Sequence, residues 1–121
     1  MARFLVMLYD DQDAMGVWEA MTPEEVERIM GEYGEWHDRL SERGLLVAGD
    51  KLVDGTGRIL RGKGDGLRVA DGPFSEAKEV VGGYFVVEAA DLDGAAELTR
   101  DCPHLEYGGM IAIREIDPTD G

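Results

Sequence analysis

The stretch DGPFSEAKEVVGGYFVVEAA, residues 71–90, decides the fold, because a polar turn leads directly into an apolar strand. Asp71 and Gly72 favour a tight turn, since an Asp side chain accepts backbone N–H bonds and Gly tolerates positive φ. The run at residues 84–87 then suits a pleated, buried surface. We therefore expect a central strand at residues 84–89. The polar loop that precedes it is expected to lie at the rim of a concave surface.

The whole chain predicts strand, helix, strands, helix and strand in that order. The predicted segments are a strand at 4–9, a helix at 23–43, a strand at 45–53, hairpin arms at 58–61 and 66–70, the strand at 84–89, a helix at 92–101, a loop at 104–109 and a strand at 110–116. Segregated helices with mostly antiparallel strands indicate an α+β fold. At 121 residues, the chain is expected to form one domain, residues 1–121.

The first helix has the clearest local signals. Thr22 is a good N-cap, Pro23 falls at the first helical position, and Glu25 completes a capping box. Gly44 is a natural residue for the end of the helix. The apolar stripe expected to face the sheet is Val26, Ile29, Met30, Tyr33, His37 and Leu40, with Trp36 beside it.

Charge and composition exclude several classes of partner. The chain has 26 acidic and 12 basic residues and a formal net charge of −14, which argues against binding nucleic acid or an anionic membrane surface. The apolar run at residues 4–9 is too short to span a bilayer, and no secretory leader is recognised before it. One cysteine, Cys102, excludes an internal disulfide. We expect a cytoplasmic protein.

The two most apolar strands predict a partner. In residues 4–9 and in residues 84–87, both alternating sets of side chains are apolar. An antiparallel sheet with one face in water should instead alternate between apolar and polar residues. Two helices can cover one face of the sheet, so the same face of a second copy is the simplest cover for the other. The pattern therefore predicts a homodimer.

The segment DGPFSEAKEVVGGYF, residues 71–85, resembles the signature of the DGPF proteins, a branch of the YciI-like (YCII-related) family. The resemblance extends to FLVMLY at 4–9, RLSERGLLVAGDKL at 39–52 and AIREI at 112–116. It implies a ferredoxin-like βαββαβ protomer, with an antiparallel sheet carrying two helices on one face, that pairs as a dimeric α/β barrel. In such a protomer the first strand and the signature strand are adjacent and central. The resemblance implies no particular reaction.

Tyr33, His37 and Asp50 are the catalytic candidates. Tyr33 and His37 are neighbours at i and i+4 on the predicted inner stripe, and His transfers protons near neutral pH. They form either a proton relay at a pocket or an amphipathic part of the core, and we favour the core. The resemblance implies an active pair of a helix His and an acid; by its distance from Gly44, that His corresponds to Tyr33. Asp50 is either the facing acid or an exposed carboxylate at a strand end.

The signature loop supplies the ligand-contact candidates Asp71, Phe74, Glu76 and Lys78. Each of these residues also has an alternative, structural role. Asp71 can anchor the turn, Phe74 can pack the loop against the protein, and Glu76 and Lys78 can form a solvated ion pair. No Walker loop, nucleophile elbow or GxGxxG motif is present, so no cofactor is expected.

The remaining His and Cys residues predict no metal site. His37 and His104 lack metal-ligand spacing. Cys102 is interpreted as a small buried residue at a helix end, with a reactive thiol as the alternative.

Two functions follow as hypotheses. The first is a homodimer with a small-molecule pocket between the first helix and the DGPF loop, used for binding or catalysis. The resemblance also implies an alternative, a non-catalytic regulatory or interaction dimer associated with an extracytoplasmic-function sigma factor. A polar cavity with convergent side chains favours the first hypothesis, and a large exposed apolar patch favours the second.

Overall fold

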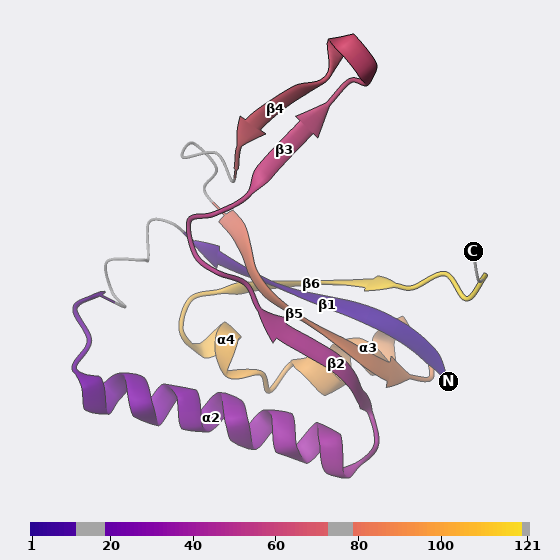
Figure 1. Cartoon of the computed structure of the whole chain (residues 1–121). Helices are drawn as coiled ribbons and strands as arrows, with labels where there is room; N and C mark the ends of the chain where they lie inside the picture. The colour runs from indigo at the N-terminus through magenta and orange to yellow at the C-terminus, as the bar shows by residue number, and fades with distance from the viewer. Residues whose placement is uncertain (12–18, 73–78, 120–121) are drawn as a thin grey trace.

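A computed structural model of the protein describes residues 1–11, 19–72 and 79–119 (Figure 1). The elements in chain order are β1 (Ala2–Asp11), α2 (Pro23–Glu42), β2 (Leu46–Lys51), β3 (Arg58–Arg61), the 3-10 helix η2 (Gly64–Gly66), β4 (Arg68–Asp71), β5 (Glu79–Ala89), α3 (Leu92–Thr99), α4 (Pro103–Glu106) and β6 (Met110–Glu115). In the part of the chain that the structure describes, no helix is long and apolar enough to cross a bilayer.

The main sheet of the described chain has the strand order β2-β5-β1-β6, and each neighbouring pair is antiparallel. The central, adjacent placement of β1 and β5 confirms the prediction for the first strand and the signature strand. Val6 illustrates the register, because it pairs with Phe85 on one side and Ile113 on the other. β5 begins at Glu79, earlier than predicted, and its pairing with β1 shifts between Leu8 and Tyr9.

The helices α2, α3 and α4 cover one face of this sheet (Figure 1). The α+β prediction is confirmed, with the short α4 added to the two expected helices. The buried core joins the inward side chains of β1 and β5 to the helices, and its largest members are Phe4, Val6, Ile29, Trp36 and Val87. Burial of such apolar surface is the main stabilising term of a domain of this size.

α2 begins and ends where its sequence predicts. The Thr22 hydroxyl accepts a hydrogen bond from the Glu25 backbone N–H at 3.2 Å, and Pro23 opens the helix. Such a cap stabilises a helix by about 1 kcal/mol. Gly44 has a φ of 70°, and the Leu45 N–H donates to the Leu40 carbonyl, which closes the final turn.

The inner face of α2 is rotated from the predicted stripe. Trp36 is buried and packs edge-on against Phe85, with ring centroids 5.1 Å apart. His37 lies about 100° further round the helix, and 47% of its side chain is exposed. The prediction that His37 lies on the buried stripe is wrong, because the larger apolar ring of Trp36 takes the inward position.

The segment after α3 corrects a second prediction. We expected Pro103 to stop the second helix and residues 104–109 to form a loop. Instead α3 ends at Thr99, and Pro103 occupies the first position of the separate helix α4. Proline suits that position because its missing N–H has no helical partner there. α4 brings His104 under the sheet.

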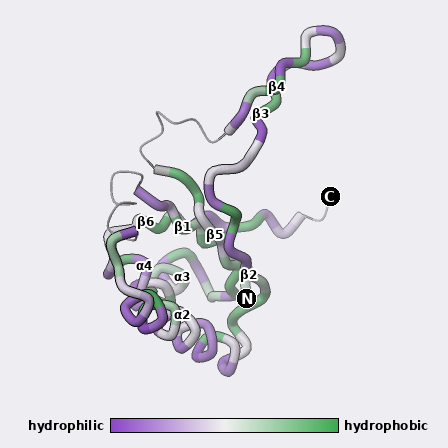
Figure 2. Tube along the Cα trace, turned by 60° about the vertical axis from the view of Figure 1, so that its left-hand side comes forward, coloured by the Kyte–Doolittle hydropathy of each residue, from purple (hydrophilic) through white to green (hydrophobic). Residues whose placement is uncertain are grey.

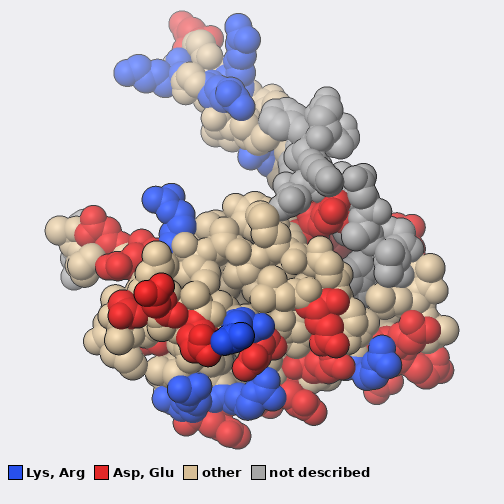
Figure 3. Space-filling model, turned by 180° about the vertical axis from the view of Figure 1, so that it is seen from behind, with Lys and Arg blue, Asp and Glu red and all other residues tan. Residues whose placement is uncertain are grey.

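The strands β3 and β4 form the predicted hairpin, which projects from the body of the molecule (Figures 1 and 2). Leu60 and Val69 pair across it and remain 60% and 57% exposed. Figure 3 shows Lys and Arg side chains gathered on this projection, while Asp and Glu are spread over the body. The hairpin is therefore a basic, partly apolar arm on an acidic protein.

Candidate functional site

A cavity of about 470 Å³ lies between the N-terminal half of α2 and the sheet near β2 and β5. Its apolar lining includes Leu8 of β1, Val26 and Met30 of α2, and Phe85 of β5. Glycines on β2 and β5 keep the sheet side of the cavity open. Gly49 is one of them, because a side chain there would collide with the ring of Phe85.

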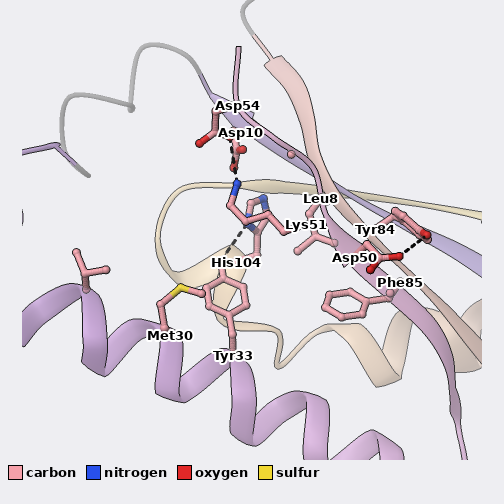
Figure 4. A pocket seen from close by; sticks show the side chains of 14 residues that line it. Leu8, Asp10, Met30, Tyr33, Asp50, Lys51, Asp54, Tyr84, Phe85 and His104 are labelled. Carbon is pink, nitrogen blue, oxygen red and sulfur yellow. Dashed lines mark hydrogen bonds and ion pairs between the residues drawn. The ribbon is translucent and has the colours of Figure 1, made fainter. Parts of the chain in front are cut away.

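His104 and Tyr33 form a hydrogen-bonded pair at this cavity (Figure 4). Tyr33 rises from α2, and its Oη lies 3.1 Å from His104 Nδ1. On the other side of the ring, His104 Nε2 lies 2.7 Å from the Tyr9 backbone oxygen. The imidazole is only 7% exposed. Both nitrogens of a buried ring are therefore occupied.

The second of these contacts assigns the tautomer. A carbonyl oxygen only accepts hydrogen bonds, so Nε2 carries a hydrogen and donates it to Tyr9. In the neutral ring Nδ1 then has a lone pair, which accepts the hydrogen of the Tyr33 hydroxyl. The Tyr33 hydroxyl thus faces the cavity with its oxygen, while its hydrogen is donated to His104.

The local sequence around His104 holds this ring in place. Gly109 N–H donates to the His104 carbonyl at 3.0 Å, and a side chain at Gly109 would collide with the imidazole. Tyr107, just after α4, donates to Glu32 of α2 at 2.6 Å. Tyr33 and Glu32 therefore tie α4 to adjacent positions on α2.

Asp10 adds a carboxylate to the same cavity. It follows Leu8 by two positions on β1, so both side chains lie on the helix side of the sheet. Its carboxylate occupies the space where a side chain on Gly82 would begin. Burial raises the pKa of the Tyr33 hydroxyl, and electrostatic interaction with Cys102 and Asp10 raises it further. Tyr33 therefore stays neutral across the physiological range.

Lys51 also lines the cavity, but its ammonium is engaged elsewhere. Its Nζ donates to the Leu52 carbonyl and to Asp54 Oδ1, each at 3.1 Å. Figure 4 shows this pair above His104. Its positive charge is thus matched by Asp54.

Of the three catalytic candidates, Tyr33 lines the cavity with its side chain and Asp50 borders it. Asp50 pairs across the strands with Tyr84, next to the inward-facing Phe85, so both point to the opposite face of the sheet. There the Tyr84 hydroxyl donates to Asp50 Oδ2 at 2.9 Å. Asp50 is therefore not the acid that faces Tyr33.

His37 is not among the described residues that line the cavity. Its half-exposed ring has Nδ1 3.6 Å from Asp38 Oδ1 and lies 6.3 Å from the ring of Phe85, between centroids, because Trp36 takes the inward position. The expectation that His37 shares a cavity with Tyr33 is therefore wrong.

The four ligand-contact candidates lie elsewhere or are not described. Asp71 ends β4 on the projecting hairpin, where its carboxylate pairs with Arg58 at 3.2 Å and is 92% exposed. Its expected place at the cavity is wrong, because β4 carries it outward with the arm. Phe74, Glu76 and Lys78 lie outside the described residues.

Sequence reasoning missed His104 as a site residue. Its partner Tyr33 lies 71 positions away, and the four-residue helix that presents it gave no periodic signal. The only local hint was His after Pro103, before the Gly108-Gly109 turn.

Cys102, just before α4, is 2% exposed, and burial raises the pKa of its thiol to about 11. This favours the buried structural interpretation over a reactive thiol. Within residues 1–11, 19–72 and 79–119, no group of three or more His, Cys, Asp or Glu side chains is placed to hold a metal ion.

Comparison with known proteins identifies the family. A model of the YCII-related domain matches residues 2–120. The chain belongs to the YCII-related family. An uncharacterised protein of Rhizobium meliloti (strain 1021) is 32% identical over 99 residues, covering 81% of this chain and 77% of that protein. In this YCII-related protein, the imidazole at the cavity comes from α4, and α2 supplies the phenol of Tyr33.

Proposed function

We propose that this YCII-related protein is a homodimer that holds a small molecule in the cavity between α2 and the sheet. The observation that carries the proposal is the His104–Tyr33 pair, whose buried imidazole has both nitrogens bonded at the wall of a mostly apolar hollow. Ligand sites typically combine apolar walls with a few convergent polar groups, in volumes of about 300–1,000 Å³. The cavity, at about 470 Å³, falls in that range.

The homodimer is proposed from the face of the sheet that the helices leave uncovered. Leu5, Met7, Tyr9 and Val86 lie there and are only partly buried in the protomer. A second copy that packs the same face against them would remove this apolar surface from water and close a dimeric α/β barrel. Such a pairing needs an interface of about 2,000 Å² or more in total.

A screen of small fragments by protein-observed NMR tests the ligand proposal. Binding is followed through the backbone amides of Gly49, Gly82 and Gly83, which line the cavity. At least one fragment should shift these three resonances, and Tyr33→Phe should weaken its binding. Asp38→Asn, at an exposed position on the same helix, is the matched control and should leave the affinity unchanged. Fragments that bind only at other surfaces, or that bind Tyr33→Phe equally well, would contradict the proposal.

The projecting hairpin favours the second candidate function, a regulatory or interaction dimer that acts with an extracytoplasmic-function sigma factor. Leu60 and Val69 are exposed together on the arm, and such contiguous apolar surface is typical of interaction sites. Replacing both by Thr keeps strand propensity and removes the apolar pair. Under this proposal the double variant loses its partner in a pull-down with a purified sigma factor; unchanged capture would contradict it.

A further inference from the structure

Two of the polar groups that line the cavity, the Tyr33 hydroxyl and the Asp10 carboxylate, offer hydrogen-bond acceptors to a ligand. The hydrogen of the Tyr33 hydroxyl is engaged by His104 Nδ1, and the hydrogen on Nε2 is engaged by the Tyr9 carbonyl. The Tyr33 oxygen keeps a lone pair, because a hydroxyl can accept as well as donate. In the neutral pair, therefore, the two rings provide an acceptor and no free donor.

The Asp10 carboxylate provides the second acceptor and a negative charge. It lies on the helix side of β1, above Gly82, and contributes to the raised pKa of Tyr33. Among the described residues, no hydrogen bond or ion pair joins this carboxylate to another side chain. The neighbouring cation, Lys51, directs two of its three ammonium hydrogens to Leu52 and Asp54.

From these acceptors we infer that the cavity binds a protonated amine carried on a small apolar body. An ammonium group supplies the hydrogens that Tyr33 and Asp10 lack, and charge-assisted hydrogen bonds to a carboxylate are the stronger kind. Leu8, Val26, Met30 and Phe85 provide the apolar walls for the rest of the ligand. The inference rests on the proposed small-molecule function and names its ligand class.

The net charge of the whole chain also favours a cationic ligand over an anionic one. A net charge of −14 raises the local concentration of cations and speeds their encounter with the protein. An anionic ligand of the same shape would meet the Asp10 carboxylate in a partly buried site and be repelled. The structure therefore predicts an order of affinity set by the charge of the ligand's polar group.

Three ring compounds of nearly equal size test this order: benzylamine, benzyl alcohol and benzoate. Each is titrated into the full chain at neutral pH and low salt, with isothermal calorimetry for affinity and the amides of Gly49, Gly82 and Gly83 for location. Benzylamine should bind about tenfold or more tightly than benzyl alcohol, and benzoate should bind least, because a hydrogen bond to a charged group is the stronger one.

Two substitutions test whether the preference for benzylamine arises in the cavity. Asp10→Asn removes the charge and keeps the size, so it should weaken benzylamine about tenfold and benzyl alcohol by much less. Asp38→Asn removes the same charge from the exposed side of α2 and should leave both affinities within about twofold, since exposed charges are screened.

The outcomes separate this inference from the proposed function. If benzyl alcohol or benzoate binds at the cavity as tightly as benzylamine, or if Asp10→Asn has no effect on benzylamine, the amine inference is wrong and the small-molecule function stands. If none of the three compounds shifts the cavity amides, the amine inference is wrong; if the fragment screen also finds no cavity ligand, the proposed function fails with it.

Discussion

At the residue scale, His104 connects three parts of the fold through one ring. It sits on α4, accepts from Tyr33 of α2 and donates to the Tyr9 carbonyl of β1. A ring bonded on both sides in this way has a fixed orientation, which is what a binding wall requires.

Two substitutions at His104 distinguish the stability contributed by its hydrogen bonds from the stability contributed by the packing of its ring. His104→Ala leaves two buried partners without a hydrogen bond and should lower the free energy of unfolding by about 2–4 kcal/mol. His104→Gln can still donate to Tyr9 and accept from Tyr33 through its amide, so it should lose less than half as much. Urea denaturation of both variants measures the difference, and equal losses would show that the two hydrogen bonds contribute nothing.

A pH prediction follows from Cys102. Burial raises the pKa of its thiol from the ordinary 9.0 to about 11, so the folded protein holds this proton more tightly than the unfolded chain. The associated stability is fully present below about pH 9 and is lost as the pH rises towards 11, with an upper limit of about 3 kcal/mol. Tyr33, whose pKa is also raised by burial, acts in the same direction at higher pH.

Cys102→Ala tests that assignment. Urea midpoints measured at several pH values between 8 and 11 should fall less steeply for the variant than for the wild type. Parallel curves would mean that Cys102 has the same pKa in the folded and unfolded states.

At the element scale, the sequence predicted what is encoded locally. Thr22 and Pro23 mark the start of α2 and Gly44 marks its end, and the glycines around residues 62–66 mark the hairpin turn. The central strands followed from their apolar composition. Each of these signals depends only on adjacent residues. It can therefore be recognised without knowledge of the tertiary structure.

The rest of the site depends on contacts between distant segments. Trp36 and His37 are adjacent, so a small rotation of α2 decides which of them faces the sheet, and packing against Phe85 sets that rotation. α4 is one turn long, too short for a periodic pattern to reveal. The Tyr33–His104 pair joins residues from both ends of the chain, and periodicity within one segment gives no information about it.

A pair of glycine substitutions tests the packing of these elements. Gly34 lies inside α2 with nothing within 4 Å of the position of an added side chain, so Gly34→Ala should raise the free energy of unfolding by up to about 1 kcal/mol. Gly49→Ala should instead lower it, because the new methyl group would meet the ring of Phe85. Thermal or urea unfolding measures both, and stabilisation by Gly49→Ala would contradict the described packing of β2.

At the scale of the whole molecule, the uncovered face of the sheet makes the assembly testable. We expect sedimentation velocity to give a dimer at micromolar concentration. Leu5→Glu places a charge in the centre of that face and should produce a monomer with an unchanged far-ultraviolet circular dichroism spectrum, since a buried unpaired charge is strongly unfavourable. Leu92→Glu, at an exposed position at the start of α3, is the matched control and should remain a dimer. A wild-type monomer, or a dimer that Leu5→Glu leaves intact, would rule out this interface.

Ligand binding in the cavity is tested most directly by a crystal structure of the protein soaked with a mixture of small cationic, neutral and anionic fragments. We expect electron density for a ligand between α2 and the sheet, with one polar atom within hydrogen-bond distance of Tyr33 Oη and His104 still bonded to both Tyr33 and Tyr9. A cavity filled by the protein's own side chains, or ligands bound only elsewhere on the surface, would contradict it.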